Sequence, residues 1–317
     1  MFELILPHLP KRLQEAILSA DYSEVCVNED GRVFVEIAGE NAMLELTGIA
    51  PTPMQLRHAV NAIARTLAGC EADETRPILN ARLPDGSRIA AMLPPVTEGV
   101  AITVRKFRPN WFTLDELATN GTVSAAFYNH LVKAVGRREN ILISGPTGSG
   151  KTTLVKALLD LIPENERVVL IEDTAELPLN RPNRVRFTAR EGVSIRDLLK
   201  ASLRHRPDRI IVGEVRDGAA YDLLQALNTG HAGSISTLHA SSAAHALNRL
   251  ARLALQADTG LPFSCTQSEI GDAIQHVAHI ERRGPRRQVT ELIRVAGFHA
   301  DRGTWQLIPV SGVVACK

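Results

Sequence analysis

Short hydrophobic runs and polar turns alternate along the first hundred residues. Residues 22–37 and residues 78–105 each read as a pair of short strands around an Asp-Gly turn, and the second pair leads into the β-rich run VAITVRKF. Between the pairs, hydrophobic residues recur at helical spacing over 54–67. This pattern predicts a smaller mixed α/β N-terminal domain over residues 1–107.

The segment RKFRPNWFT, residues 105–113, combines charge, a proline and aromatic residues, and a helical run ending near Arg138 follows it. We therefore predict a linker over residues 108–120 and a second domain over residues 121–317. A chain of 317 residues is long enough for two domains of about 150 residues each.

From Asn140 onward, hydrophobic strands alternate with amphipathic helices. The strand candidates are ILIS, RVVLIE, RIIVGE and SISTLH, and the helix candidates include TTLVKALLDLI and SIRDLLKASLR. Such alternation is typical of a mainly parallel sheet covered on both faces, so the fold class is α/β. After about residue 260 the pattern changes, and VAHIERR, RQVTELIRVAGF and TWQLIPV resemble antiparallel strands around Gly284-Pro285.

Charge and composition limit the classes of function. Lys and Arg number 36 and Asp and Glu number 35, a net charge of +1, and aromatic residues make up 4%. A protein that binds nucleic acid stably usually has a basic excess and aromatic residues for base stacking, so we expect no stable nucleic-acid binding. No window approaches 18 uninterrupted apolar residues, and the order of charges in MFELILPHLPKR is wrong for a secretory signal, which favours a cytoplasmic location.

The cysteines indicate neither a disulfide-stabilised fold nor a metal-binding protein. Cys26, Cys70, Cys265 and Cys316 lie far apart, without a C-x-x-C pair or a histidine at ligand spacing. We expect reduced and mostly buried thiols, with no disulfide framework and no structural zinc site.

The run Gly145-Pro146-Thr147-Gly148-Ser149-Gly150-Lys151-Thr152 matches the phosphate-binding pattern G-x-x-x-x-G-K-[ST] in full, and Thr153 follows it. A hydrophobic strand precedes the run and an amphipathic helix follows. The glycines let several backbone N–H groups point at one anion, and the helix N-terminus adds partial positive charge. Lys151 is expected to reach the β- and γ-phosphates of ATP, and Thr152 is expected to supply a hydroxyl ligand to Mg²⁺.

Polar residues end three of the neighbouring strand candidates. Ligands bind beyond the carboxyl ends of strands in open α/β sheets, so these residues are candidates for the reaction. Glu214, after RIIVG, is the candidate Walker B acid and second metal ligand, and Glu172, after RVVLI, is the candidate catalytic base. His239, at the end of GHAGSISTLHA, is the candidate γ-phosphate sensor, and His231 is a weaker candidate.

Arginines are a further group of candidates, because an arginine can stabilise the charge of a phosphoryl-transfer transition state. Arg88 and Arg105 lie in the last strands before the linker, and Arg204, Arg206 and Arg216 flank RIIVGE. The basic run of Arg282, Arg283, Arg286 and Arg287 is read as a solvated hairpin, with contact to acidic lipid head groups as the alternative.

Four motifs stand in order over about a hundred residues: GPTGSGKTT, IEDTAEL, LRHRPDRIIVGEVRD and NTGHAGSISTLHA. Together they resemble the Walker A, Asp box, Walker B and His box of the secretion-ATPase superfamily of type II and type IV secretion systems, and most closely its TrbB-type conjugal transfer ATPases. The tetracysteine element of type II members and the C-terminal helix motif of pilus-retraction members are missing from this sequence.

The resemblance implies a RecA-like P-loop NTPase motor domain, an N-terminal domain placed over the nucleotide, and a homo-hexameric ring. It also implies attachment to inner-membrane secretion components at the cytoplasmic face, with peripheral membrane contact. Carried onto matching positions, Lys151 and Thr152 become phosphate and Mg²⁺ ligands, Glu172 the base, Glu214 the Walker B acid and His239 the sensor. Arg105 matches an arginine that the N-terminal domain lends to the nucleotide, and Arg88 is expected to assist it.

The first functional hypothesis is therefore a Mg²⁺-dependent ATPase that powers pilus assembly or substrate translocation in type IV secretion or conjugal transfer. The alternatives are a motor of type II secretion or of type IV pilus assembly or retraction, a DNA-stimulated translocase, and a nucleotide-switched scaffold without turnover. A GTPase is disfavoured because the chain has no N-K-x-D sequence to recognise guanine.

Overall fold

The computed structural model describes residues 6–37, 42–68, 72–83, 85–107, 111–284 and 286–311. The chain divides into two compact units, Met1–Asn110 and Trp111–Lys317. Each unit has its own hydrophobic core, and each is described separately below.

In the described part of the first unit, six strands form one antiparallel sheet in the order β3-β2-β1-β6-β5-β4. They are β1 (Tyr22–Val27), β2 (Val33–Ile37), β3 (Met43–Glu45), β4 (Ile78–Arg82), β5 (Arg88–Met92) and β6 (Ala101–Arg105). The two predicted strand pairs are confirmed, whereas β3 was not predicted.

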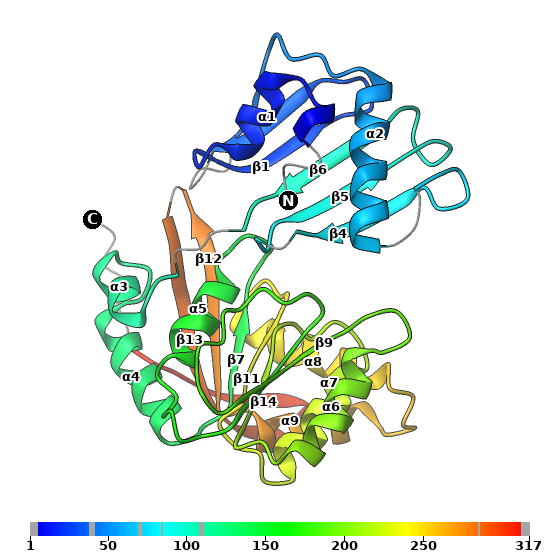
Figure 1. Cartoon of the computed structure of the whole chain (residues 1–317). Helices are drawn as coiled ribbons and strands as arrows, with labels where there is room; N and C mark the ends of the chain where they lie inside the picture. The colour runs from blue at the N-terminus through cyan, green and yellow to red at the C-terminus, as the bar shows by residue number, and fades with distance from the viewer. Residues whose placement is uncertain are drawn as a thin grey trace. The chain divides into compact units, whose positions relative to one another are not determined.

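Two helices, α1 (Lys11–Leu18) and α2 (Pro53–Ile63), contribute to the core of this unit together with one face of the sheet (Figure 1). Helix α2 confirms the helical spacing and begins at a capping box in which Thr52 and Gln55 exchange hydrogen bonds. A π-helical turn, Ala64–Ala68, follows α2.

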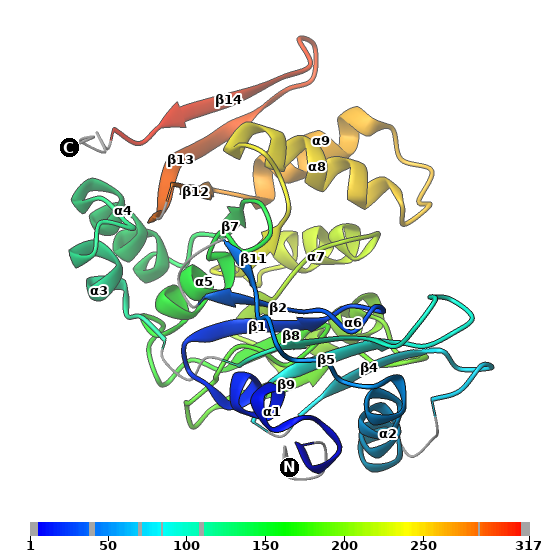
Figure 2. The ribbon, with the colours of Figure 1, turned by 90° about the horizontal axis from the view of Figure 1, so that it is seen from above.

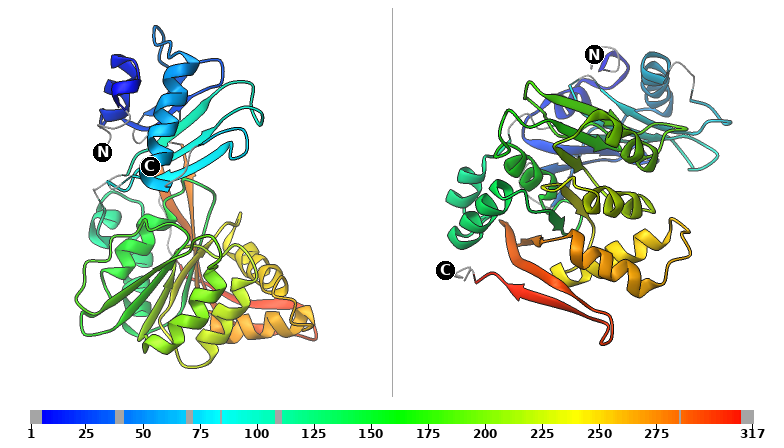
Figure 3. Two further views of the ribbon diagram at one scale, coloured as in Figure 1. Left: turned by 45° about the vertical axis from the view of Figure 1, so that its right-hand side comes forward. Right: turned by 90° about the horizontal axis from the view of Figure 1, so that it is seen from below.

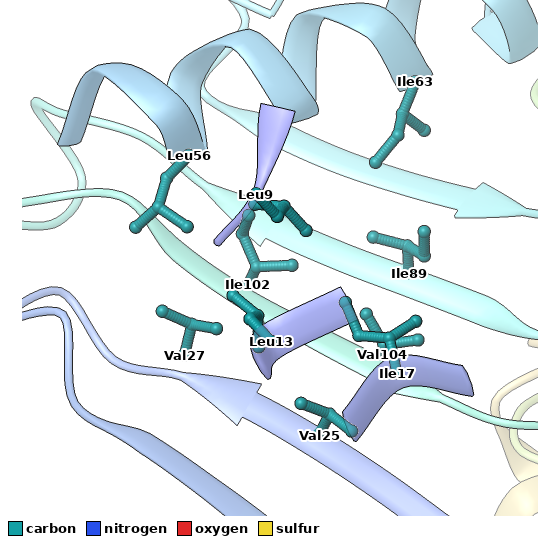
Figure 4. A pocket seen from close by; sticks show the side chains of 10 residues that line it. All are labelled: Leu9, Leu13, Ile17, Val25, Val27, Leu56, Ile63, Ile89, Ile102 and Val104. Carbon is teal, nitrogen blue, oxygen red and sulfur yellow. The ribbon is translucent and has the colours of Figure 1, made fainter. Parts of the chain in front are cut away.

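A small cavity of about 10 Å³ lies in the core of the first unit (Figure 4). Ten apolar side chains from both helices, the preceding turn and the sheet line it: Leu9, Leu13, Ile17, Val25, Val27, Leu56, Ile63, Ile89, Ile102 and Val104. A volume of about one water molecule with an apolar lining offers no ligand site, so the cavity is a feature of packing.

In the described part of the second unit, eight strands form a sheet in the order β14-β13-β12-β7-β11-β10-β8-β9. They are β7 (Ile141–Ser144), β8 (Val168–Glu172), β9 (Arg184–Thr188), β10 (Arg209–Val212), β11 (Ile235–Leu238), β12 (His276–Arg283), β13 (Arg286–His299) and β14 (Thr304–Pro309). The strands from β12 to β9 are parallel, and β13 and β14 continue the sheet antiparallel beyond β12.

Helices cover both faces of this sheet (Figures 1 and 2). One face packs against α3 (Leu114–Thr119), α4 (Ala125–Gly136) and α5 (Lys151–Leu159). The other face packs against α6 (Ile195–Ser202), α7 (Ala219–Asn228), α8 (Ala243–Leu255) and α9 (Phe263–Ala273). Figure 3 shows the same layers from two further directions. The predicted α/β class is confirmed, with a parallel sheet between two helical layers.

The predicted linker, residues 108–120, differs from the structure in its second half. Residues 108–110 lie outside the described residues, but α3 occupies Leu114–Thr119, and Leu114 and Leu117 are buried in the core of the second unit. A capping box between Thr113 and Glu116 starts this helix. The aromatic and proline content of the segment suggested a linker, but the cap and the buried leucines determine the local structure.

The thiols also differ in part from the prediction. Cys26 is half-buried and Cys265 is exposed, and both are free. Cys70 and Cys316 lie outside the described residues. No described helix combines the length and the hydrophobicity that crossing a membrane requires.

Candidate nucleotide site

The candidate site lies at one edge of the second unit's sheet. Strands β7, β11, β10 and β8 are parallel neighbours, so their carboxyl ends meet there. The phosphate-binding loop, residues 145–150, follows β7, and His239 follows β11. Glu214 stands two residues beyond β10, and Glu172 is the last residue of β8. The order of the strands therefore places the predicted residues along one edge.

The phosphate-binding loop requires glycine at particular positions. Gly148 and Gly150 have φ of +72° and +103°, in the left-handed region that favours glycine. A Cβ on Gly145 would stand 2.0 Å from the carbonyl oxygen of Ile280 in β12, so only glycine fits there without a backbone shift. Gly150 is also the N-cap of α5, whose first residue is Lys151. The loop is thus a tight turn leading into a helix N-terminus.

Lys151 is folded back onto the loop. Its Nζ donates to the carbonyl oxygens of Gly145 and Pro146, both at 2.8 Å, and lies 3.2 Å from Nδ1 of His239. The side chain is 8% exposed, and burial lowers the pKa of Lys151 to about 8. These three acceptors match the three N–H donors of an ammonium group, so an incoming phosphate must replace some of them.

His239 links Lys151 to Glu214. Its Nδ1 accepts from Lys151, and its Nε2 lies 3.2 Å from a carboxylate oxygen of Glu214. An imidazole that accepts at Nδ1 carries its proton at Nε2, and in His239 this nitrogen is the one that lies near the Glu214 carboxylate. A histidine in this position can register the arrival of a phosphate through both of its ring nitrogens.

Glu214 is also held by Arg216, which bridges two strand ends. Arg216 contacts both oxygens of Glu214, at 2.8 and 2.9 Å, and lies 3.3 Å from Asp173 beyond β8. Burial acts to raise the pKa of Glu214, but the hydrogen bond to Arg216 and the nearby positive charges outweigh it, and the pKa lies below its usual value. Glu214 is therefore an ionised carboxylate suited to an electropositive ligand.

Glu172 has a different environment. It is 3% exposed, and its Oε1 accepts from the backbone N–H groups of Glu176 and Leu177, both at 2.9 Å. Its Oε2 is buried and makes no hydrogen bond, with Arg186 at 3.8 Å. Burial raises the pKa of Glu172. One oxygen is thus fixed and the other is available, and the raised pKa suits a general base near neutral pH.

Two residues that sequence reasoning missed support these carboxylates. A Cβ on Gly213 would stand 3.1 Å from Cγ of Glu172, so glycine leaves room for that side chain. Thr237 in β11 donates from its hydroxyl to the Gly213 carbonyl at 2.6 Å, which ties β11 to the turn before Glu214. The glycine before Glu214 and the threonine before Leu238-His239 were visible in the motifs, but without strand order they had no meaning.

The hairpin of β12 and β13 contacts the other side of the phosphate-binding loop. In β12, His279 forms a 2.9 Å hydrogen bond with Ser144, the last residue of β7, and both side chains are buried. In β13, Arg287 donates from Nε to the Gly148 carbonyl at 3.0 Å. The basic run was read as a solvated hairpin, and for Arg287 that interpretation is wrong because its side chain lies against the loop.

The remaining arginine and histidine candidates lie elsewhere. Arg88 and Arg105 are cross-strand partners in the first unit, on the sheet face opposite its core, and Arg105 lies 3.4 Å from Glu24. Arg204, Arg206 and His231 precede β10 or β11, so within the second unit they lie at the opposite edge of the sheet from the loop. Contacts of Arg88 and Arg105 with a nucleotide stay a prediction.

The residues present fit a Mg²⁺-nucleotide. The hydroxyl of Ser149 is buried in the loop without a hydrogen-bond partner, and Thr152 follows Lys151 in the first turn of α5. Among the described residues, no three His, Cys, Asp or Glu side chains gather as a metal site. Mg²⁺ takes one or two protein ligands and completes its shell with phosphate oxygens and water, a requirement that a hydroxyl and a carboxylate can meet.

Comparison with known proteins identifies the family. The type II/IV secretion system protein family matches residues 11–289. The chain belongs to this family. The resemblance inferred from the four motifs is thereby confirmed.

Individual members of the family resemble the chain along most of its length. A conjugal transfer protein TrbB from Rhizobium radiobacter is 38% identical over 304 residues, which cover 92% of each protein. A type IV secretion system protein VirB11 from Bartonella quintana is 33% identical over 291 residues, covering 79% of this chain and 78% of that protein.

Solved structures of a secretion ATPase and of a pilus motor share the fold. The VirB11 ATPase of the Brucella suis type IV secretion system, in complex with sulphate, is 30% identical, with a TM-score of 0.51 and coverage of 92% of this chain and 97% of that one. The pilus retraction motor PilT with bound ADP is 20% identical, with a TM-score of 0.65, covering 96% and 83%. The predicted RecA-like motor domain and smaller N-terminal α/β domain are therefore the architecture of this secretion ATPase family.

Proposed function

We propose that this chain is the ATPase motor of a type IV secretion or conjugal transfer system. The observation that carries the proposal is the contact chain from Lys151 through His239 to Glu214, beside the buried carboxylate of Glu172. In the proposal, Lys151 is the phosphate-binding ammonium, Glu214 the ionised carboxylate and Glu172 the base of raised pKa, all along one edge of the sheet. Phosphoryl transfer to water needs this set of positioned charges.

Binding begins with an exchange of partners. The run from Gly145 to Thr153 binds the phosphates through its backbone N–H groups, and Lys151 leaves the carbonyls of Gly145 and Pro146 for phosphate oxygens. Thr152 and Glu214 are the residues that hold Mg²⁺. When bound, the metal neutralises charge on the β- and γ-phosphates.

Hydrolysis then depends on Glu172. Backbone N–H groups fix its Oε1, so Oε2 is the atom that accepts a proton from the attacking water. His239 loses its contact with Lys151 when that ammonium moves to the phosphates, and this change reports the γ-phosphate to β11. Arg105, assisted by Arg88, supplies positive charge from the first unit, as the family resemblance implies.

The secretion role rests on the relatives. Those named for conjugal transfer and type IV secretion are 33–38% identical over most of their length, and the pilus retraction motor is 20% identical. This difference favours type IV secretion over the pilus alternative. The working form is a homo-hexameric ring at the cytoplasmic face of the bacterial inner membrane, bound to membrane components of the secretion system, as in the resemblance.

The direct test is Mg²⁺-dependent phosphate release from ATP by the full chain. We expect turnover by the natural protein and a loss of about 10²- to 10³-fold for Lys151→Ala, because a charge that stabilises the transition state is removed. Lys156→Gln is the matched control, because Lys156 is a second lysine of α5 and pairs with Asp160 instead of contacting the loop. Turnover by Lys151→Ala at the natural rate contradicts the proposal.

Two further measurements separate the alternatives. The mass of the assembly with and without ATP and Mg²⁺ tests the ring, and a strictly monomeric chain in both conditions contradicts it. Stimulation of hydrolysis by DNA, with steep salt dependence, favours the translocase over the secretion motor. Nucleotide binding without any turnover favours the scaffold.

A further inference from the structure

Arg287 has no role in the reaction proposed above, yet it touches the phosphate-binding loop. Its Nε donates to the Gly148 carbonyl at 3.0 Å. Its Cδ lies 3.1 Å from the point where a Cβ on Gly150 would stand, so the stem of the side chain crosses the loop at that glycine. Arg287 is 139 positions from Gly148 in the sequence. It reaches the loop because β13 pairs with β12 and β12 pairs with β7, the strand that precedes the loop.

The side of the loop that Arg287 occupies is informative. Glu172, Glu214 and His239 follow β8, β10 and β11, which all lie on one side of β7. These groups act on the γ-phosphate, so the triphosphate points toward that side. Its nucleoside end leaves the loop in the other direction, where β12 and β13 stand beside β7.

We propose that the guanidinium of Arg287 forms the flat surface on which the purine base of the bound nucleotide stacks. This inference rests on the proposed nucleotide-binding function and adds the group that holds the nucleoside. A guanidinium is planar and stacks on aromatic rings, and the hydrogen bond from Nε to Gly148 fixes it at one edge. The stacking face is the same for ATP and ADP, so Arg287 contributes to nucleotide affinity and not to the chemical step.

The hairpin is packed firmly enough to hold such a surface in place. The Ile280 carbonyl occupies the space that a Cβ on Gly145 would need, and Cδ1 of Ile280 lies 3.4 Å from the corresponding point at Gly150. His279 is joined to Ser144 at the base of the loop. The hairpin is therefore packed directly against the loop, and this backbone packing sets the position of Arg287 relative to the loop.

The test compares the binding of two ligands to the full chain by titration calorimetry. ADP contains a base, whereas inorganic tripolyphosphate contains only phosphates. Arg282 stands opposite Arg287 in the β12–β13 register, so this face also carries positive charge, and the second ligand separates charge from stacking. For Arg287→Ala we expect about tenfold weaker binding of ADP and a clearly smaller loss of affinity for tripolyphosphate, which reports the removed charge alone.

Two variants complete the design. Arg287→Lys keeps the charge but loses the planar face, and we expect it to restore little of the ADP affinity. Arg286→Ala is the control, because Arg286 is exposed and its side chain alternates to the other face of β13. In steady-state hydrolysis, Arg287→Ala should raise KM for ATP with little change in kcat.

Three outcomes overturn the inference: unchanged ADP affinity in Arg287→Ala, an equal loss for tripolyphosphate, or full rescue by lysine. Each is distinct from a failure of the proposed function. If the natural protein binds neither ADP nor ATP, the nucleotide site itself is wrong. If the natural protein binds and hydrolyses ATP while Arg287→Ala binds ADP with unchanged affinity, only the stacking role of Arg287 is contradicted.

Discussion

The two sides of the phosphate-binding loop are built from different interactions. Toward β11, β10 and β8 the neighbours carry charge: Lys151, His239, Glu214 and Arg216 form one chain of contacts. Toward β12 and β13 the loop is held by packing at Gly145, by the hydrogen bond between His279 and Ser144, and by one charged donor, Arg287. The charged contacts on the first side are ones that an incoming phosphate can replace, whereas the contacts on the second side hold the backbone of the loop in place.

Removing charge from the first side should have the largest effect. In Glu214→Gln, His239 and Arg216 lose their ionised partner, and the metal loses a ligand. We expect ATP hydrolysis to fall about 10²- to 10³-fold, with the fold unchanged. Phosphate release and circular dichroism are the measurements, with exposed Glu164→Gln as control. A loss of less than about twofold would remove Glu214 from the site.

Adding volume to the second side should have the next largest effect. In Gly145→Ala, the new Cβ meets the Ile280 carbonyl at 2.0 Å, and the loop or β12 must shift. We expect the free energy of unfolding to fall by about 2–3 kcal/mol, measured in urea. Gly148→Ala is the matched control because a Cβ there meets nothing within 4 Å.

The control variant Gly148→Ala should lose about 1 kcal/mol, from its left-handed φ alone. Equal losses for the two variants would mean that β12 does not fix the loop. Gly145 also has a positive φ, +156°, so the difference between the two variants reports the contact with β12 beyond the cost of a positive φ.

The smallest effect should come from protonation on the second side. Burial lowers the pKa of His279, as it does for His276 and His130. Below the ordinary histidine pKa of about 6.5, these histidines bind protons in the unfolded chain but not in the folded one. The free energy of unfolding is therefore greatest above this pH and falls as the pH decreases through it.

His279→Asn removes one of these protons while leaving Ser144 a polar partner. We expect the loss of unfolding free energy between about pH 8 and about pH 5.5 to be smaller than in the natural protein. In the control His245→Asn, at an exposed position, the free energy of unfolding should fall by as much over this pH range as it does in the natural protein. If His279→Asn behaves like that control, His279 is not protected from protonation in the fold.

The charged side of the loop could be predicted from the sequence, and the packed side could not. Glu172, Glu214 and His239 each follow a hydrophobic strand within a strand-helix alternation, so the rule that parallel strands present their carboxyl ends together was enough. His279 lies 135 residues from Ser144 at the end of β7, and Arg287 lies 139 residues from Gly148 in the loop. Their contacts exist only because β12 pairs parallel with β7, which the antiparallel pattern of the C-terminal strands did not reveal.

Other elements show the same limit in different ways. Helix α8 was not predicted, although Ala246, Leu247 and Leu250 stand at helical spacing and are buried. In the edge strand β9, exposed residues alternate with partly buried ones. Its place beside β8 follows from strand pairing, which no local sequence pattern encodes. Local signals predicted turns and hydrophobic periodicity, whereas the order of neighbouring strands in the sheet required the structure.

The central claim is that this strand edge hydrolyses ATP with Glu172 as the base. The most direct measurement is to compare Glu172→Gln with the natural protein for both ATP binding and phosphate release. The glutamine keeps the acceptor for the N–H groups of Glu176 and Leu177 but cannot take a proton from water at neutral pH. We predict ATP binding within about threefold of the natural value and turnover reduced by about 10²- to 10⁴-fold. Turnover at the natural rate in Glu172→Gln would contradict the account.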